Sequence, residues 1–431
     1  MKILFLVPYA PSLVRVRSYN LIRALVQRGH TVTLATLWSN AAERANLAEL
    51  EALGVELLAE PISRARALWN CARNFSRPTP LQSVYAWQPR LLERVVNALL
   101  PNKSDSNHQP RANAAFDVIH IEHLRGARYA EHLKTFLRAM DDPTPVVWDS
   151  VDCISLLFEQ AAHASSSTWS RFVTGRELTR TRWYEAWLVR QFERVLVTSA
   201  RDRSAFFDLL NEFAPASGAY FPALERIRVL PNGVRLDYFA PCAIARDCQT
   251  IVFTGKMSYH ANVTAALYLV HQVMPLVWEK YPNACAQIVG QNPPRELKTL
   301  AARFPHRVIV TGTVPDVRPY LAKATLAVAP ILYGAGIQNK VLEALAMAAP
   351  VVATPCAVAA LDVEHEQQLL IADAPEAFAG AIIRLLRNIG LRERLGQNGR
   401  AYVNAHHDWM DIAARLEAIY QETALAPLQP V

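Results

Sequence analysis

Lys340 and Glu343 stand one helical turn apart in the stretch whose residues and spacing carry the most chemistry. Residues 330–355 read PILYGAGIQNKVLEALAMAAPVVATP, which predicts a turn at Gly334 and Gly336, a helix of about three turns and an apolar strand. A close backbone turn followed by a helix N-terminus suits an anion. The pair would therefore suit a sugar nucleotide, and the plainer interpretation is a solvated surface pair behind an ordinary turn.

Polar residues also follow two apolar strands in the first half of the chain. Glu122 and His123 come after the strand from Phe116 to Ile121, and Asp152 comes shortly after the strand from Val146 to Trp148. Open α/β sheets bind ligands at the carboxyl ends of their strands. A His there can relay a proton, and a carboxylate beside it can orient it.

Other interpretations of these residues remain open. His120 lies within its strand, where a lone His is usually a core residue with its hydrogen bonds satisfied. We therefore favour His123 as the histidine of the site. Asp149 and Asp152 have the alternative role of capping a helix that starts at Ile154.

The elements that position these residues indicate two domains with parallel sheets. A strand from Lys2 to Val7, a helix from Leu21 to Arg28 and a strand from Thr31 to Thr36 form a βαβ unit. The run from Ile251 to Gly255 repeats the strand-then-loop pattern, and 431 residues exceed one ordinary core. The Pro- and Gly-containing segment from Glu212 to Arg226 is the predicted linker.

Composition narrows the class of protein. A content of 52% hydrophobic and 19% charged residues is globular, and the net charge of +7 suits an anionic substrate, an anionic membrane surface or an unspecific basic surface. The six cysteines lack metal-ligand spacing and indicate reduced cytosolic thiols. The opening apolar run reaches prolines at once, and the longest apolar stretch is broken by Glu343 and Pro350. We therefore expect no secretory signal and no membrane span, and a cytoplasmic protein with peripheral attachment to the membrane as an option.

Arginine and aromatic residues interleave between Ile62 and Arg94. Such a segment can lie in a membrane interface or bind nucleic acid, or its aromatics can be core residues. The absence of any RNP, KH or zinc signature argues against nucleic acid as a partner. Residues 101–115 contain almost no large apolar side chain and are expected to be a disordered insertion. An Arg-rich helix is expected from Thr168 to Arg194.

The stretch from 330 to 355 resembles the signature of retaining glycosyltransferases of family 4. In that family a second glutamate, matched by Glu343, holds the ribose of the nucleotide, and Ala335 stands where the first glutamate is usual. The pattern is most like the subgroup associated with exopolysaccharide and PEP-CTERM export systems, whose members carry a small residue there and a Lys matched by Lys340. Residues 229–234 resemble the strand and turn that open the donor domain of the family.

The resemblance also implies the other donor contacts. Lys256 takes the place of an Arg that neutralises the diphosphate, and Ala261 leaves a neighbouring Lys position empty, for which Lys340 would compensate. The backbone of Val314 would bind the base, and the amides of Gly336 and Ile337 would bind the phosphates or the sugar.

On the acceptor side, the resemblance matches His123 or His120 to a His that contacts the transferred sugar. The first loop of the family carries a Gly-Gly pair, which residues 12–15 lack. Arg15 and Arg17 would supply charge there instead, or form a basic loop without a role. Asp152 would contact an acceptor hydroxyl.

The predicted fold is α/β, of the GT-B type, with two facing Rossmann-like domains and an interdomain cleft. The predicted boundaries are 1–215 for the acceptor domain, 225–405 for the donor domain and 406–431 for a helix that crosses back. The expected activity is transfer of a hexose, with retention, from a nucleotide diphosphate sugar to a glycan or lipid-linked acceptor in exopolysaccharide biosynthesis. His123 and Glu122 are its expected catalytic residues.

Neither a cofactor nor a metal is expected, because the sequence contains no DxD triplet to hold a divalent ion on the diphosphate. Two alternatives remain. One is a degenerate, non-catalytic member that binds a glycan or nucleotide, and the other is a sugar-nucleotide epimerase on the same fold.

Overall fold

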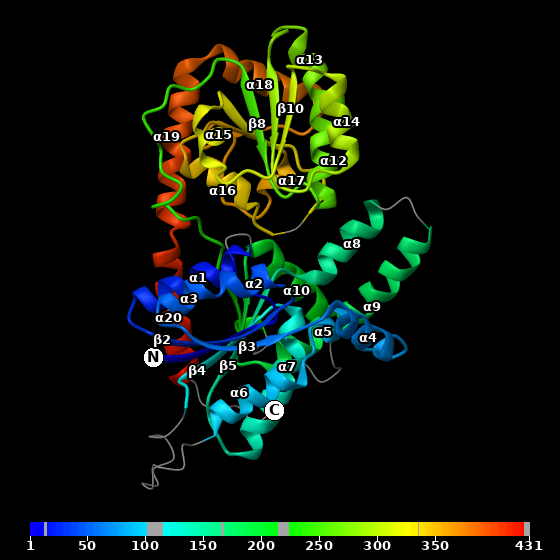
Figure 1. Ribbon diagram of the computed structural model, residues 1–431, viewed down its shortest axis with the longest axis vertical. Coiled ribbons are helices and arrows are strands. Elements are labelled where there is room, and N and C mark those ends of the chain that lie inside the picture. Colours follow the sequence, from blue (N-terminus) through cyan, green and yellow to red (C-terminus); the bar gives the residue numbers. More distant parts are fainter. Residues whose placement is uncertain (13–14, 101–114, 165–167, 214–223, 335, 426–431) are drawn as a thin grey trace. The chain divides into compact units, whose positions relative to one another are not determined.

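The computed structural model describes residues 1–12, 15–100, 115–164, 168–213, 224–334 and 336–425, with the backbone alone at 160–164 and 168–173. It divides into two compact units (Figure 1). Unit 1 comprises Met1–Pro231 and Trp409–Val431, and unit 2 comprises Asn232–Asp408. Four predictions fall wholly or largely outside the described residues. They concern the insertion at 101–115, the linker from Glu212 to Arg226, the first loop at residues 13 and 14, and Ala335.

The described part of unit 1 contains a seven-stranded parallel sheet in the order β3-β2-β1-β4-β5-β6-β7. The strands are β1 (Lys2–Val7), β2 (Thr31–Trp38), β3 (Glu56–Pro61), β4 (Val118–Glu122), β5 (Val146–Val151), β6 (Arg194–Val197) and β7 (Ile227–Val229). The helices are α1 (Val16–Gln27), α2 (Ala41–Asn46), α3 (Ala48–Ala52), α4 (Arg64–Asn74), α5 (Leu81–Tyr85), α6 (Pro89–Leu99), η1 (Leu124–Gly126), α7 (Ala127–Ala139), α8 (Ile154–Ala164), α9 (Thr168–Gln191), α10 (Ala200–Glu212) and α20 (Trp409–Leu425).

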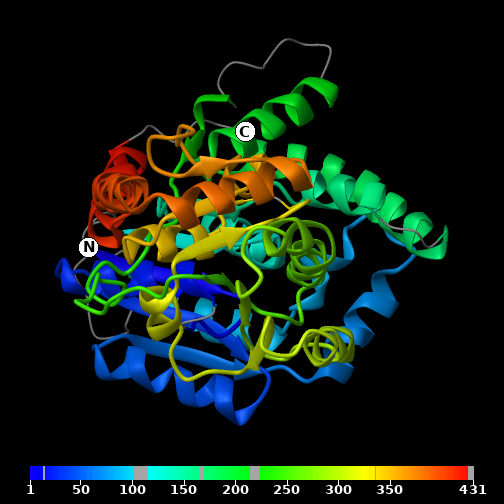
Figure 2. The same cartoon turned by 90° about the horizontal axis from the view of Figure 1, so that it is seen from above.

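Both faces of this sheet are buried, because successive side chains of a strand point to opposite faces. Ile3 and Phe5 of β1 belong to a core formed with α1 and α20. Leu4 and Leu6 belong to a second core formed with α6, α7, α9 and α10. The near-continuous apolar run of β1 is therefore what a central parallel strand requires, and helices cover both faces (Figure 1, Figure 2).

The described part of unit 2 repeats the design with six parallel strands in the order β10-β9-β8-β11-β12-β13. The strands are β8 (Thr250–Thr254), β9 (Cys285–Val289), β10 (Val308–Gly312), β11 (Leu326–Ala329), β12 (Val351–Ala353) and β13 (Leu370–Ile371). The helices are α12 (His260–Tyr268), η2 (Leu269–Val273), α13 (Met274–Trp278), α14 (Arg295–Arg303), α15 (Arg318–Lys323), α16 (Asn339–Ala346), α17 (Pro355–Val358), α18 (Pro375–Arg387) and α19 (Ile389–His406).

Each sheet therefore has the doubly wound order of a Rossmann fold, counted within its own unit. The direction of winding reverses between β1 and β4 in unit 1 and between β8 and β11 in unit 2. Such a fold leaves a crevice for ligands outside the carboxyl ends of the two strands at the reversal. The strand order thus locates one candidate binding edge in each unit.

The structure differs from the sequence-based prediction in two places. Helix α1 begins at Val16 rather than Leu21, because Arg17 and Asn20, which look like loop residues, are buried and hydrogen-bonded within the fold. Strand β7 pairs with β6, so unit 2 begins at Asn232 rather than near residue 225. The strand at 227–229 closes the first sheet instead of opening the donor domain.

Helix α20 lies against α1 and contributes Ile412, Leu416 and Tyr420 to the core of unit 1. None of the helices in the described ranges combines the length and the apolar character needed to cross a bilayer.

Candidate active site

In unit 2 the predicted residues gather at the carboxyl ends of β8 and β11. Gly255 and Lys256 directly follow β8, and the loop after β11 leads into α16, whose second residue is Lys340. A Cβ placed on Gly255 would lie 3.3 Å from Cε of Lys340, so the stem of this lysine crosses the end of β8. Lys340 Nζ donates to Oε1 of Gln338 at 2.9 Å.

A close approach between two glycines shapes this edge. A Cβ on Gly290, which follows β9, would lie 1.6 Å from the carbonyl oxygen of Gly255. The Gly255 amide donates to the carbonyl of Val289 at 3.0 Å, which extends the pairing of β8 and β9 past the strand ends. Asn262 holds the turn from within, because its Nδ2 donates to the Lys256 carbonyl at 2.9 Å. The glycines therefore allow a side chain from α16 to reach the sheet edge.

Lys340 and Glu343 are both half-buried, and their protonation is tuned by their surroundings. Burial lowers the pKa of Lys340 to about 8, against the opposing effect of Glu343. Burial raises the pKa of Glu343 to about 7, against the opposing effect of Lys340. A cation and a readily protonated carboxyl one helical turn apart can receive a phosphate and a pair of hydroxyls, respectively.

The other predicted donor residues lie around this edge. Lys256 is exposed, Gly336 is half-buried with φ +75°, and Ile337 is buried in the core of unit 2, two residues before α16. Ala261 is buried in α12, so that position supplies no cation, as the sequence indicated. Ala335 lies outside the described residues.

Val314 follows β10 and packs partly against the core of unit 2. Beside it is a cavity of about 640 Å³ over the carboxyl ends of β9 and β10, lined by Asn292, Pro293, Lys298, Val310, Thr311, Gly312 and Thr313. Val314 itself is not a lining residue of this cavity. Asp316 accepts the Arg318 amide at 2.9 Å and pairs with the Arg318 side chain, just before and at the first residue of α15.

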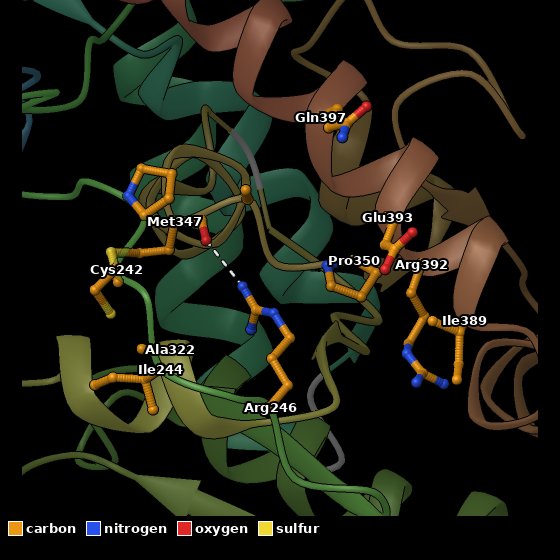
Figure 3. Close-up of a pocket in the computed structure, with 12 residues that line it drawn as sticks. Cys242, Ile244, Arg246, Ala322, Met347, Pro350, Ile389, Arg392, Glu393 and Gln397 are labelled. Atoms are coloured by element: carbon orange, nitrogen blue, oxygen red, sulfur yellow. Dashed lines mark hydrogen bonds between the residues drawn. The ribbon is translucent and has the colours of Figure 1, made fainter.

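A second cavity, of about 430 Å³, lies near the amino ends of the strands, away from their carboxyl ends (Figure 3). Pro350, which lines it, directly precedes β12. Arg246 faces it and donates to the carbonyls of Leu321, Ala324 and Met347 at 2.7, 3.0 and 2.9 Å. These bonds cap the carboxyl ends of α15 and α16. The cavity therefore borders helix termini and is distinct from the edge that holds Lys340.

In unit 1 the end of β4 carries the predicted catalytic pair. Glu122 is 1% exposed, and its Oε1 accepts a short hydrogen bond from Tyr9, which follows β1. Burial and the nearby carboxylate of Asp149 raise the pKa of Glu122 to about 7. Because Glu122 is enclosed, it can position Tyr9 but has little access to a ligand.

His123 has the geometry of a neutral hydrogen-bond donor. Its Nδ1 accepts the Arg125 amide at 3.2 Å, which leaves the ring proton of the neutral form on Nε2. Burial and the Arg125 guanidinium lower the pKa of His123 to about 3. Tyr9 packs edge-on to the ring, with centroids 6.2 Å apart. The backbone of His123 has φ 68°, a strained conformation of the kind that clusters at functional sites.

His120 is a core residue. Its ring stacks on Phe5 with centroids 4.0 Å apart, and its Nδ1 meets the Tyr420 hydroxyl at 2.8 Å. Its Nε2 lies 3.5 Å from Oδ2 of Asp149. Burial lowers the pKa of His120, against the opposing effect of Asp149. Of the two candidate histidines, His120 is thus part of the core of unit 1, and His123 is the one at the candidate site.

The predicted acceptor residues are positioned by different contacts. Arg15 lies over the ring of Tyr9, 4.9 Å from its centroid, and forms an ion pair with Glu43 at 3.4 Å. Asp152 accepts from the hydroxyl of Thr198 at 3.1 Å, and burial and Asp202 raise its pKa to about 7. Arg15 directly precedes α1, and its contact with Tyr9 keeps it beside the candidate site.

Two alternatives from the sequence are wrong. Neither Asp149 nor Asp152 caps α8, because Glu185 of α9 accepts the amides of Ile154 and Ser155 at 2.8 and 3.1 Å. Arg17 is no free cation for a ligand, because it is enclosed and paired with Asp149.

Tyr9 was missed by the sequence analysis. The signal that would have found it is its place, two residues after the strand at which the winding reverses.

Residues 248–388 match a family model described as glycosyl transferases group 1. This region of the chain is therefore similar to group 1 glycosyltransferases. The match supports, for this region, the glycosyltransferase family and the transferase class predicted from the sequence, while family 4 and the exopolysaccharide subgroup stay predictions. Among the residues that the structure describes, no cluster of His, Cys, Asp and Glu could hold a metal ion.

Curated relatives of the chain extend the comparison. A putative glycosyltransferase of Bacillus subtilis, YtcC, is 25% identical over 231 residues, which cover 47% of this chain and 56% of the relative. The chain spans about half the length of the curated relatives that it matches.

Two solved structures share the fold over nearly the whole chain. Sucrose-phosphate synthase from Thermosynechococcus elongatus has a TM-score of 0.65 at 17% identity and covers 98% of both chains. Alr3699/HepE of Anabaena, solved with UDP-glucose, has a TM-score of 0.64 at 16% identity over 98% of this chain and 100% of its own. At this identity the likeness shows the fold, and the predicted GT-B fold with two Rossmann-like units is confirmed.

Proposed function

We propose that the protein transfers a hexose from a nucleotide diphosphate sugar to a glycan or lipid-linked acceptor, with retention at the anomeric carbon. The observation that carries this proposal is the placement of Lys340 over Gly255, at the sheet edge where the winding of unit 2 reverses, with Glu343 one turn further along α16. The similarity of residues 248–388 to group 1 glycosyltransferases supports it.

In this proposal the region that is similar to group 1 glycosyltransferases, residues 248–388, binds the donor. Lys256 and Lys340 bind the diphosphate, Glu343 accepts hydrogen bonds from the ribose, and the backbone near Val314 receives the base beside the 640 Å³ cavity. Amides of Gly336 and Ile337 bind the phosphates or the sugar. Two cations stabilise the negative charge that builds on the diphosphate as the glycosidic bond breaks.

For unit 1 we assign to His123 a hydrogen bond from Nε2 to a hydroxyl of the transferred sugar. The pKa of about 3 keeps the ring neutral, so His123 does not act as a general acid at neutral pH. The leaving phosphate accepts the proton of the acceptor hydroxyl, so the bond to the leaving oxygen breaks as the bond to the acceptor oxygen forms on the same face. Arg15 and Asp152 contact the acceptor, and Glu122 positions His123 through Tyr9.

We also propose that the protein belongs to family 4 and acts in exopolysaccharide biosynthesis, at the cytoplasmic face of the membrane and without a metal or other cofactor. The support is the residue pattern of Lys340 and Glu343. A non-catalytic binding protein is the second candidate, and the observation that favours it is the buried Ala261 at a position where a cation is usual.

A thermal-shift panel of UDP-, GDP- and ADP-sugars, with hydrolysis of each followed in parallel, tests the function. A ligand at a hundred times its dissociation constant stabilises a fold by about 2.7 kcal/mol, which such a scan detects. We expect one donor to stabilise the wild type and to be hydrolysed slowly, and the shift to shrink in Lys340→Ala. Lys280→Ala is the charge-matched control, because Lys280 is an exposed lysine between α13 and β9, at the amino end of β9.

Binding without turnover on any acceptor would favour the non-catalytic candidate. No shift with any nucleotide sugar would overturn the transferase and leave the non-catalytic candidate as a glycan-binding protein. Release of an isomerised sugar without an acceptor would identify an epimerase. Once the donor is known, the anomeric coupling constant of the product, measured by NMR, decides between retention and inversion.

A further inference from the structure

Helix α4 of unit 1 carries its larger apolar residues on the outside. Leu68 and Trp69 are 66% and 60% exposed, whereas the buried residues of the helix are Ala67, Asn70 and Asn74. An amphipathic helix on a globular domain normally has the reverse arrangement. In both views α4 lies at the outside of unit 1 (Figure 1, Figure 2).

The inner side of α4 explains how the helix stays in place without those apolar residues. Asn70 Nδ2 donates to the carbonyls of Trp87 and Tyr85 at 2.9 and 3.4 Å. Asn74 Nδ2 donates to the Asn70 carbonyl at 2.7 Å. Asn70 therefore holds α4 against the end of α5 and the segment that follows it, and the exposed Leu68 and Trp69 take no part in this attachment.

The outer side has a regular order. At roughly 100° per residue, Ala65, Leu68, Trp69 and Ala72 share one strip. Arg64 lies on one flank of the strip, and Arg66 and Arg73 lie on the other; all seven residues are exposed. We call these seven residues the α4 face.

The charge of the surrounding segment has one sign. Residues 61–80 contain four arginines, including Arg77 just after the helix, and neither Asp nor Glu. Phe75 continues the exposed apolar surface and is 4.7 Å, ring centroid to guanidinium carbon, from Arg176 of α9. An apolar strip with cationic flanks matches the boundary between headgroups and acyl chains, where Trp is enriched and arginines meet anionic headgroups.

We propose that the α4 face binds the surface of an anionic lipid bilayer, with Leu68 and Trp69 entering the interface and the flanking arginines on the headgroups. A single-stranded nucleic acid fits less well, because stacking of successive bases needs several aromatic rings and the strip holds one. An acidic protein surface would pair with the arginines but would not offer the exposed Leu68 an apolar surface to contact.

A chain of contacts leads from the α4 face to the candidate site. Asn70 donates to the Tyr85 carbonyl, and the Arg125 guanidinium lies 5.3 Å from the Tyr85 ring centroid. The Arg125 amide in turn donates to His123. Docking of α4 would thus hold the end of β4 near the membrane surface. This consequence, which would bring a lipid-linked acceptor to His123, rests on the proposed function.

Co-sedimentation of the full chain with vesicles tests the proposal. The vesicles are an equal mixture of phosphatidylcholine and phosphatidylglycerol, compared with phosphatidylcholine alone. We expect binding to the anionic vesicles that weakens as salt is raised. Leu68→Ser with Trp69→Ser should weaken it at least tenfold, and Arg66→Gln with Arg73→Gln by about 25-fold, since each arginine near such a surface contributes about fivefold.

Ile389→Ser is the matched control, because Ile389 is 61% exposed but lies in unit 2. It should leave vesicle binding unchanged, and all variants should keep the wild-type melting temperature because they alter exposed side chains. Wild-type protein that ignores anionic vesicles, or variants of the α4 face that bind as tightly as wild type, would overturn the proposal. Preferential binding of poly(U) through the same residues would also overturn it. Donor-induced stabilisation is measured separately, so loss of vesicle binding and failure of the proposed function are distinguishable.

Discussion

The guanidinium of Arg17 and the carboxylate of Asp149 form a buried ion pair that joins α1 to β5. Arg17 Nε and Nη2 lie 2.8 and 2.7 Å from Oδ2 of Asp149, and Nη1 donates to the Leu230 carbonyl at 3.0 Å. The pair thus ties together three segments of unit 1 beside the ends of β4 and β5. Removing one partner leaves the other charge buried and uncompensated.

We therefore expect Arg17→Met to lower the free energy of unfolding of unit 1 by about 3–5 kcal/mol. Combining it with Asp149→Asn should recover part of this loss, because the double variant leaves no unpaired charge. Urea unfolding of the wild type, both single variants and the double variant measures the coupling. Additive effects would show that the pair does not act as a unit.

The contact between Gly290 and Gly255 gives a prediction for unit 2. A Cβ on Gly290 would lie 1.6 Å from a backbone oxygen, which cannot move without disrupting the pairing of β8 and β9. Gly290→Ala should cost more than about 4 kcal/mol and abolish donor binding. Gly312→Ala is the control, because Gly312 has φ +74° with no atom near its Cβ position, and it should cost only about 1–2 kcal/mol. Equal melting temperatures of the two variants would contradict this account.

The architecture could be predicted from the sequence because its signals are local. Buried strands such as β1 and β8 are apolar runs followed by turn residues, and their alternation with helices indicates parallel sheets. The relation of Lys340 to Glu343 was predictable for the same reason, since both belong to one helix.

Long-range relationships were not predictable in this way. Arg17 and Asp149 are 132 positions apart, and Arg17 looked like a loop cation until its partner was known. Strand β7 has three residues, so its pairing with β6, not its own pattern, decides where unit 1 ends. The exposure of Leu68 and Trp69 could not be foreseen either, because an aromatic residue in a helix is usually buried.

Glu185 should make the stability of unit 1 depend on pH. Burial raises its pKa to about 7, while its hydrogen bonds to the amides of Ile154 and Ser155 oppose this effect. The folded state therefore retains a proton that the unfolded state releases near pH 4.3. The resulting stabilisation is complete below that pH and is lost as the pH rises through about 7.

The stability difference between wild type and Glu185→Gln should accordingly change by up to about 3 kcal/mol between about pH 5 and about pH 8, with the wild type losing ground at the higher pH. Urea unfolding across this range measures it. Glu93→Gln, an exposed carboxyl on α6, should show no such change. A constant difference for Glu185→Gln would mean that Glu185 is ionised in the folded protein throughout.

Lys340 should make donor binding depend on pH in the alkaline range. Burial lowers its pKa to about 8, so the ammonium that binds the diphosphate in our proposal is present below that pH and lost above it. Losing a charge-assisted contact costs about 1.5–3 kcal/mol, or roughly 10- to 100-fold in affinity. Bound diphosphate favours the charged lysine and raises its pKa, so the affinity should begin to fall near pH 8, the pKa in the free protein, and level off above the higher pKa of the complex.

Lys340→Arg isolates this effect, because its guanidinium stays charged across the range while Glu343, whose pKa of about 7 also affects the site, is unchanged. Calorimetric titration of the nucleotide diphosphate identified in the thermal-shift panel should give a dissociation constant that rises between about pH 7 and about pH 9.5 for the wild type. The same constant should stay nearly flat for Lys340→Arg. Parallel profiles for the two proteins would place the titrating group elsewhere, and Glu343→Gln would then show whether the carboxyl is responsible.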